Sequence, residues 1–405
     1  METYLQVFSG GFSKRIVDLE KLTEKIKLIS NQIKVTGVIA GWSADKEFYK
    51  ELKAFLKEQD ILLYFWLPVF SELDHYKEFQ NVIDYNNNEI VSTGFQEGEN
   101  FNFYCPNDEK NIENIKSIFL ENFSDYDIDG VFLDKIRYPS FSNGINSIFT
   151  CFCDTCVKKM EESDINVIEL KNEIKNILDN SENNNLNPLG IKEYKNFKFE
   201  FENPEINGFF EFKEKSINNT LIHLTDFFRK HNLKVGYDLF APHISYFTGQ
   251  NILSLSNHAD FVKPMYYRRT YAPAGIPFEI KSYSQSFTKQ KYFEITEKFF
   301  KIIGQNVKNQ ENISDEYMEQ ELICLKSNFG IKNICAGLEF NQIENIAPTN
   351  KVYLKHSLKS FYNAKIDGIV LSWDLMSIPY EHLTAYIESR QQNESKNSDS
   401  GGGCK

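Results

Sequence analysis

The chain has 405 residues and a net charge of −12, with 45 lysines and arginines against 57 aspartates and glutamates. Hydrophobic residues make up 41% and charged residues 25%, a balance that excludes a mostly disordered, collagen-like or fibrous chain. The acidic excess argues against a nucleic-acid partner, which requires a basic face. No run of about 18 apolar residues is present, so we expect no membrane association. The N-terminus lacks the basic and apolar regions of a secretion signal, which predicts a cytoplasmic protein.

Eight short apolar runs recur along the chain, most of them followed by segments with helical periodicity. The expected strands are residues 4–8, 35–40, 61–69, 130–133, 234–239, 261–267, 333–338 and 368–372. Helices are expected at 45–59, 108–123, 209–231 and 314–329. Continuous β-branched and aromatic runs bounded by turns indicate parallel strands covered on both faces. Eight such units predict an α/β protein with a (β/α)8 TIM barrel. A doubly wound open sheet is the alternative, but the first strand is not followed by a glycine-rich phosphate fingerprint.

Two long segments interrupt this alternation, after the third and the fourth strand. We therefore expect a single barrel over residues 1–390 with loop insertions at about 71–107 and 139–200. Long loops at the carboxyl ends of barrel strands usually build the functional site. The polar, Gly-rich residues 391–405 are expected to be a disordered tail.

Three of the seven cysteines stand close together, as Cys151-x-Cys153-x2-Cys156. A tetrahedral zinc ion needs four sulfur or nitrogen ligands, and Cys105 in the preceding insertion is the best fourth candidate. Four thiolates leave no open coordination position, so the predicted zinc is structural and no catalytic cofactor is expected. Cysteines without a metal, or redox-active cysteines, are the alternative.

Acidic residues stand at the ends of four predicted strands: Asp134, Asp238, Glu339 and Asp374. Polar residues at the carboxyl ends of barrel strands usually belong to the active site. Two carboxyl groups that flank a glycosidic bond can cleave it, because one donates a proton while the other attacks the sugar or activates water. The first three residues are therefore candidate catalytic groups. Asp374 is expected either to bind substrate or to hold a loop through backbone N–H groups.

Other side chains near the strand ends could bind a sugar. The rings of Trp42, Trp66, Tyr266, Tyr267 and Trp373 could stack on a sugar or pack the rim of the barrel, two readings of equal weight.

Three polar residues complete this set. Arg137 and Tyr138 follow Asp134 closely and are expected to orient it or a substrate hydroxyl. His243 is a candidate proton partner or substrate donor, although a lone histidine is more often a structural hydrogen-bonding group.

The segment 129–140, DGVFLDKIRYPS, resembles a strand of hypothetical glycoside-hydrolase-like barrels that are distantly allied to the α-amylase superfamily. VGYDLF at 235–240 resembles their next strand, and GQ at 249–250, ADFV at 259–262 and PMYY at 264–267 resemble the stretch that follows. The order and spacing match over roughly residues 126–275.

This resemblance implies that Asp134 is the nucleophile-like carboxylate and that Asp238 is the second acidic group. The α-amylase type has Glu at the latter position, and other barrel glycosidases use the seventh strand, which favours Glu339. The four cysteines are similar to the structural zinc site of some barrel β-galactosidases.

The sequence thus predicts a glycoside hydrolase with a carbohydrate substrate. The alternative is a non-catalytic glycan- or peptide-binding barrel, because a fold alone does not determine function. The ending Gly401-Gly402-Gly403-Cys404 could serve as a modification or attachment site for a modifying enzyme, or could be an idle tail or a cloning remnant.

Overall fold

In the computed structural model, eight parallel strands close into a barrel in the order β1-β12-β9-β8-β7-β4-β3-β2. The structure describes residues 1–405 except 13–15, 91–100, 180–184, 306–311 and 401–405, and the side chains of 397–400 are also left out. The barrel strands are β1 (Glu2–Phe8), β2 (Gly37–Gly41), β3 (Leu62–Pro68), β4 (Gly130–Asp134), β7 (Lys234–Phe240), β8 (Phe261–Met265), β9 (Cys335–Glu339) and β12 (Gly368–Ser372). All eight strands expected from the sequence are present, so the predicted (β/α)8 fold is confirmed.

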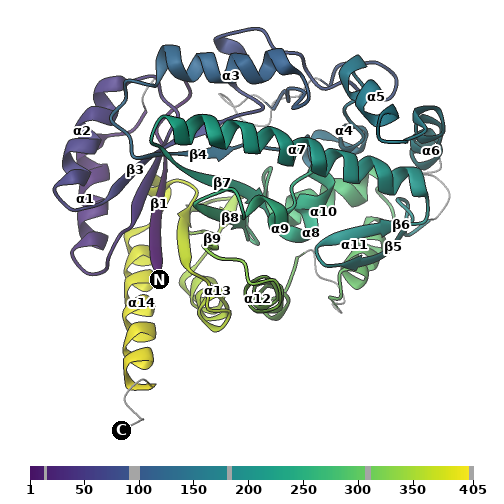
Figure 1. Cartoon of the computed structure of the whole chain (residues 1–405). Coiled ribbons are helices and arrows are strands. Elements are labelled where there is room, and N and C mark those ends of the chain that lie inside the picture. Colours follow the sequence, from purple (N-terminus) through teal and green to yellow (C-terminus); the bar gives the residue numbers. More distant parts are fainter. Residues whose placement is uncertain (13–15, 91–100, 180–184, 306–311, 401–405) are drawn as a thin grey trace.

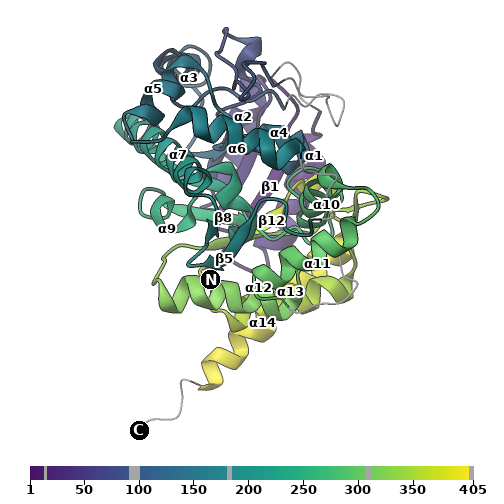
Figure 2. The same cartoon turned by 90° about the vertical axis from the view of Figure 1, so that its right-hand side faces the viewer.

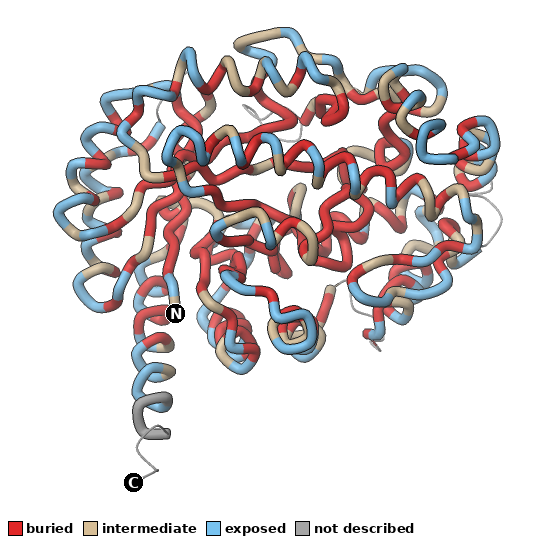
Figure 3. Tube along the Cα trace, in the orientation of Figure 1, coloured by how far each residue is buried: buried red, intermediate tan, exposed pale blue. Residues whose placement is uncertain are grey.

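Helices surround the barrel, with their outer faces exposed and their inner faces packed on the buried strands (Figure 3). The surrounding helices include α1 (Leu19–Ser30), α2 (Lys46–Lys57), α3 (Glu109–Asn122), α7 (Pro204–Lys230), α12 (Asp315–Ile323), α13 (Lys351–Asn363) and α14 (Tyr380–Ser400). Several begin at a side chain that accepts a backbone N–H of the first turn: Asp45 for α2, Asp108 for α3, Asn203 for α7 and Asn350 for α13. These caps satisfy N–H groups that have no partner within the helix. The four helices expected from the sequence are confirmed to within a few residues.

Aromatic rings fill the barrel interior toward the amino ends of the strands. Phe261 stacks on Tyr4 at a centroid distance of 4.4 Å and on Phe132 at 5.7 Å. Gly236 makes this possible, because a Cβ atom at that position would lie 2.4 Å from the Phe261 ring. These rings close the barrel at the amino ends of its strands, so we look for the active site at the carboxyl ends.

Both expected insertions lie beyond the carboxyl ends of the strands. The first has a bridge Ile83–Glu89 and a bridge Asn81–Tyr104, which joins the parts before and after residues 91–100; these ten residues lie outside the described part. The second folds into α4 (Ile145–Ile148), α5 (Asp154–Glu161), α6 (Val167–Asp179) and a hairpin of β5 (Ile191–Lys195) and β6 (Lys198–Phe201).

Later connections add α8 (Pro242–Ser245), α9 (Ile252–Leu255), α10 (Ile276–Phe287), α11 (Tyr292–Ile302) and the short strands β10 (Gln342–Ile343) and β11 (Ala347–Pro348). Helices α4, α6, α10 and α11 gather with the β5–β6 hairpin on the right-hand side of Figure 1, which faces the viewer in Figure 2.

The end of the chain differs from the expectation. Helix α14 continues to Ser400 and projects away from the barrel (Figure 1), whereas disorder was expected from residue 391. Residues 391–400 contain no glycine or proline to end the helix, and the first helix breaker is Gly401. The Gly-Gly-Gly-Cys ending itself lies outside the described residues. Among the described helices, none is long and apolar enough to cross a membrane.

Candidate active site and cysteine cluster

A cavity of about 130 Å³ opens at the carboxyl ends of the barrel strands. Its walls are formed by Gln6, Trp42, Trp66, Phe101, Asp134, Lys135, Arg137, Asp238, Met265, Tyr267, Thr270, Ala272, Pro273, Ala274 and Trp373. Seven residues expected at the site line it, namely Trp42, Trp66, Asp134, Arg137, Asp238, Tyr267 and Trp373. The other five expected residues, Tyr138, His243, Tyr266, Glu339 and Asp374, are not part of its lining.

Asp134 is the last residue of β4 and is held by two N–H donors. Its Oδ2 accepts a hydrogen bond of 2.9 Å from the indole Nε1 of Trp66, and its Oδ1 accepts one of 2.5 Å from the backbone N of Lys135. Gly41 on the neighbouring strand allows Trp66 to lie there, because a Cβ atom on Gly41 would come within 2.3 Å of the Trp66 Cβ. Both hydrogen bonds fix the position of the carboxyl group at the cavity wall.

Asp238 on β7 lies deeper and is only 3% exposed. Its Oδ2 accepts a hydrogen bond of 3.0 Å from Nζ of Lys263, which is its register partner on β8 and also donates to Oε1 of Gln6 at 2.8 Å. Burial raises the pKa of Asp238 to about 7, with Lys263 acting in the opposite direction and the charge of Asp134 adding to the rise. Oδ1 of Asp238 has no hydrogen-bond partner among the described residues. Asp238 can therefore hold a proton near neutral pH on the oxygen that Lys263 leaves free.

Glu339 ends β9 and is fully buried beside the cavity rather than in its wall. Its Oε1 accepts hydrogen bonds from the backbone N of Arg269 and from the Tyr353 hydroxyl, the latter at 2.9 Å. Burial raises the pKa of Glu339 to about 7. These contacts tie the segment after β8 to the start of α13.

Arg137 and Tyr138 are neighbours in the sequence, but their side chains lie in different parts of the structure. The Arg137 guanidinium reaches the cavity and packs against the rings of Phe103 and Phe240, at 4.5 and 4.6 Å from their centroids. Burial lowers the pKa of Arg137 to about 10, so the group stays charged at neutral pH. The Tyr138 hydroxyl instead accepts a hydrogen bond from Asn107 at 3.2 Å, next to the cysteines. Its expected role in orienting Asp134 or a substrate hydroxyl is not supported by this placement.

Three of the expected binding residues take part in hydrogen-bond networks away from the cavity. His243 and Tyr266 both contact the buried carboxylate of Glu321, with Nδ1 of His243 at 3.3 Å and the Tyr266 hydroxyl at 2.8 Å. Asp374 accepts from the backbone N of Phe8 and Met376. Asp374 thus has the loop-holding contacts that the sequence left open as an alternative.

Aromatic rings enclose the cavity near Asp134. Trp42 and Trp66 meet edge to face at a centroid distance of 4.9 Å, and Phe8 packs on Trp42 at 5.0 Å. Tyr267 is fully enclosed, and its pKa is raised well above the ordinary value by burial and then by the nearby charge of Asp238. The rings therefore both pack the rim and form the cavity wall.

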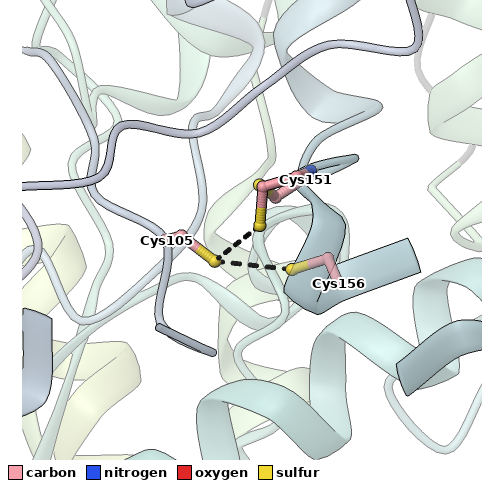
Figure 4. A group of neighbouring side chains, drawn as sticks. Cys105, Cys151 and Cys156 are labelled. Atoms are coloured by element: carbon pink, nitrogen blue, oxygen red, sulfur yellow. Dashed lines mark hydrogen bonds between the residues drawn. The ribbon is translucent and has the colours of Figure 1, made fainter. Parts of the chain in front are cut away.

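The four predicted metal ligands do come together. Sγ of Cys105 lies 3.4 Å from that of Cys156 and 3.6 Å from that of Cys153, and all four ligand atoms, Cys151 included, lie within 4.8 Å of one another. Figure 4 shows the sulfur of Cys105 pointing toward those of Cys151 and Cys156. Metal–sulfur bonds of about 2.3 Å in a tetrahedron place sulfur atoms about 3.8 Å apart. The arrangement is compatible with one tetrahedral ion.

Neighbouring donors support these thiolates. The backbone N atoms of Ile83 and Cys153 donate to Sγ of Cys151 at 3.3 and 3.4 Å, and the Asn107 amide donates to Sγ of Cys156 at 3.3 Å. Such contacts orient and stabilise metal-bound thiolates. Asn107 also donates to Tyr138, which links the cluster to the segment after β4.

Two residues of the site, Lys263 and Gln6, were not anticipated from the sequence. Lys263 lies inside an apolar run. A single charged residue within a strand that is predicted to be buried could have indicated a functional role for Lys263. Gln6 gives a similar signal within β1. Lys135 lines the cavity and pairs with the buried Glu72, and both have a left-handed backbone, with φ of 51° and 69°. Such strain in residues other than glycine is common at functional sites.

No protein-family model matches the sequence, and no curated protein matches it either. Solved structures do share the fold. The PgaB (BpsB) glycoside hydrolase domain from Bordetella bronchiseptica aligns with a TM-score of 0.58 and 11% identity, covering 97% of this chain and 98% of that one.

Two other structures align over part of their length. A β-galactosidase from the psychrophilic Marinomonas ef1 gives a TM-score of 0.55 with 9% identity, covering 99% of this chain and 60% of that one. The α-L-fucosidase isoenzyme 2 from Paenibacillus thiaminolyticus gives 0.52 with 11% identity, covering 98% and 50%. The chain therefore has a barrel fold that is also found in several glycoside hydrolases.

Proposed function

We propose that this protein is a glycoside hydrolase that cleaves a glycosidic bond with Asp134 and Asp238. The observation that carries this proposal is that both carboxyl groups, from adjacent barrel strands, line one small cavity together with Trp42, Trp66 and Trp373. A pair of carboxyl groups facing one sugar-sized space is what acid-assisted glycoside cleavage requires.

The surroundings of the two groups support different roles. Asp238 is the proton donor, because burial raises its pKa to about 7 and its Oδ1 is free of protein partners among the described residues. Asp134 is the nucleophile or base, because two N–H donors hold its carboxyl group in the cavity wall with both oxygens acting as acceptors. In the reaction, Asp238 would give its proton to the leaving oxygen. Asp134 would then attack the anomeric carbon or take a proton from the attacking water.

Glu339 is the other candidate acid, and like Asp238 it keeps one oxygen, Oε2, without a hydrogen-bond partner among the described residues, but its place outside the cavity wall favours Asp238. One oxygen of Glu339 is committed to Arg269 and Tyr353, and the side chain is not part of the cavity lining. The sugar would lie against the tryptophan rings, whose faces and edges suit the apolar face of a pyranose.

We also propose that Cys105, Cys151, Cys153 and Cys156 hold a metal ion and that this ion is zinc. A set of four thiolates favours zinc among the common divalent ions of proteins and leaves no position for substrate. Its contribution would be structural, by fixing the two insertions to each other. No catalytic step passes through this site.

The test is hydrolysis of a panel of activated aryl glycosides by the wild-type protein and by four aspartate variants. Asp134→Asn and Asp238→Asn should each lower kcat by at least about a thousandfold, as expected for loss of an acid, base or nucleophile. Asp226→Asn, on the exposed face of α7, is the matched control and should retain full activity. For Asp134→Ala, azide should restore turnover if the residue is a nucleophile.

Activity that survives in both Asp134→Asn and Asp238→Asn would refute the mechanism. Saturable sugar binding without turnover of any glycoside would instead support the non-catalytic glycan-binding alternative. The anomeric form of the first product, followed by NMR, would distinguish retention from inversion.

A further inference from the structure

We infer that the sugar bound in this cavity carries a carboxylate, and that the guanidinium of Arg137 and the amide of Gln6 bind it. The substrate class would then be a glycoside of a uronic acid. This inference rests on the proposed function, because it names the substrate of the same cavity. It is drawn from donors in the cavity wall that the protein leaves without acceptors.

Arg137 is the main donor. Its side chain is only 5% exposed, yet among the described residues no carboxylate oxygen lies within 4.0 Å of its nitrogens. Within the described part of the chain, its side chain donates one hydrogen bond, from Nη1 to the carbonyl oxygen of Tyr138 at 3.0 Å. Phe103 and Phe240 pack against the group. A guanidinium has five N–H donors, so most of them remain for a ligand.

The carboxyl groups whose charges act on Arg137 accept their hydrogen bonds from other residues. Glu279 accepts from Ser140, Ser142 and Ala274, which uses both of its oxygens. Asp134 accepts from Trp66 and Lys135, and Asp238 accepts from Lys263. These carboxylates lower the cost of burying Arg137, but none of them is bonded to it.

Gln6 supplies a second free donor. Its Oε1 accepts from the ammonium of Lys263, which donates only, so the orientation of the amide is fixed. The remaining atom of the amide group is therefore the donor Nε2, and it has no hydrogen-bond partner among the described residues. The Thr270 hydroxyl, also in the cavity wall, likewise lacks a partner in that part of the chain.

The chemistry of these donors selects an anion. A buried cation without a hydrogen-bonded anion is costly, and a neutral sugar hydroxyl would bring no negative charge to the guanidinium. The planar guanidinium matches the two oxygens of a carboxylate, and charge-assisted hydrogen bonds are the strong ones. A cavity of about 130 Å³ holds a single ring with its substituent, so the carboxylate and the scissile bond would belong to the same sugar.

The test compares the binding of methyl glycosides of glucuronic, galacturonic and mannuronic acid with that of the corresponding neutral sugars. Calorimetry with the full chain should show at least one uronide binding about tenfold tighter than its neutral counterpart, the gain expected from a charge-assisted pair. Arg137→Met keeps the packing against the phenylalanines and should abolish the preference. Arg137→Lys should restore part of it.

Two further variants control for folding and location. Gln6→Glu replaces the free donor by an acceptor and should weaken uronide binding more than neutral-sugar binding. Arg229→Met, on the far end of α7 where the arginine lies 3.9 Å from Asp260, should leave the preference unchanged. Circular dichroism of each variant identifies those that do not fold.

Three results would overturn the inference: equal affinity for neutral sugars, no uronide binding, or a preference that survives in Arg137→Met. Binding of sulfated or phosphorylated sugars alone would overturn the assignment of a carboxylate. If uronides bind as expected but none is cleaved, the inference stands and the proposed hydrolysis fails. If neutral glycosides are cleaved and no preference for uronides is found, the proposed hydrolysis stands and the inference of a carboxylate-bearing substrate fails.

Discussion

The ammonium of Lys263 lies 3.0 Å from Oδ2 of Asp238, and both side chains are enclosed within the barrel. This contact leaves one oxygen of Asp238 free and joins the carboxyl group, through Lys263, to Gln6 on β1. A buried charge pair of this kind adds little net stability but fixes the position of its members. Lys263 therefore acts as a positioning residue for the proposed acid.

Removal of the Lys263 side chain should lower the free energy of unfolding by an amount that depends on pH. In Lys263→Met, ionised Asp238 has no partner, so we expect a loss of about 3–5 kcal/mol at pH 8. The loss should be smaller at pH 5, where Asp238 is neutral. Urea unfolding at both pH values measures this. Lys50→Met, which breaks an exposed pair with Glu47, should change stability by less than about 1 kcal/mol. Equal losses at the two pH values would contradict the role of Lys263.

The raised pKa of Asp238 predicts the direction of a stability change with pH. Because its pKa in the folded state is about 7, above that of the unfolded chain, the folded protein holds this proton more tightly. This contribution is complete below about pH 4 and is lost as pH rises through 7. Relative to Asp238→Asn, the wild-type free energy of unfolding should therefore fall from pH 4 to 8, by up to about 4 kcal/mol. Parallel curves for the two proteins would contradict this.

The hydrogen bond from Trp66 should contribute to catalysis by holding Asp134. Trp66→Phe keeps a ring but removes the indole N–H, and a hydrogen bond to a charged group is worth about 1.5–3 kcal/mol. We expect kcat to fall about tenfold to a hundredfold. Trp42→Phe is the matched control, because no hydrogen bond of the Trp42 indole is present in the described part of the structure. A similar loss of kcat in both variants would indicate a packing effect.

Metal content tests the cysteine cluster. Elemental analysis should find one zinc per chain, and Cys105→Ser should lose it, whereas Cys324→Ser, a half-buried cysteine outside the cluster, should keep it. Loss of the ion should lower Tm, because metal binding contributes to the stability of the folded state. Since Asn107 joins Cys156 to Tyr138, which directly follows the cavity-lining Arg137, sugar binding should also weaken. Protein that is metal-free but otherwise equally stable would exclude a structural ion.

The eight strands could be predicted from the sequence because buried parallel strands are continuous apolar runs bounded by turns. The (β/α)8 fold followed from their number. The four cysteines could also be selected as one group, since three of them are close in the sequence and Cys105 lies in the other insertion. The helical continuation of residues 391–400 was missed because polar composition alone does not distinguish an exposed helix from a disordered tail.

Only the tertiary structure separated the residues of the site from their neighbours. Arg137 and Tyr138 are adjacent in sequence, yet one contacts the cavity and the other the cysteine cluster, because the chain turns after β4. Asp134, Asp238 and Glu339 all end strands, but whether a strand-end side chain enters the cavity depends on loops packed above it. The pairing of Asp238 with Lys263 and Gln6 depends on register between strands distant in sequence. The apolar pattern therefore determined the barrel, and contacts across the barrel decided which polar side chains share the cavity.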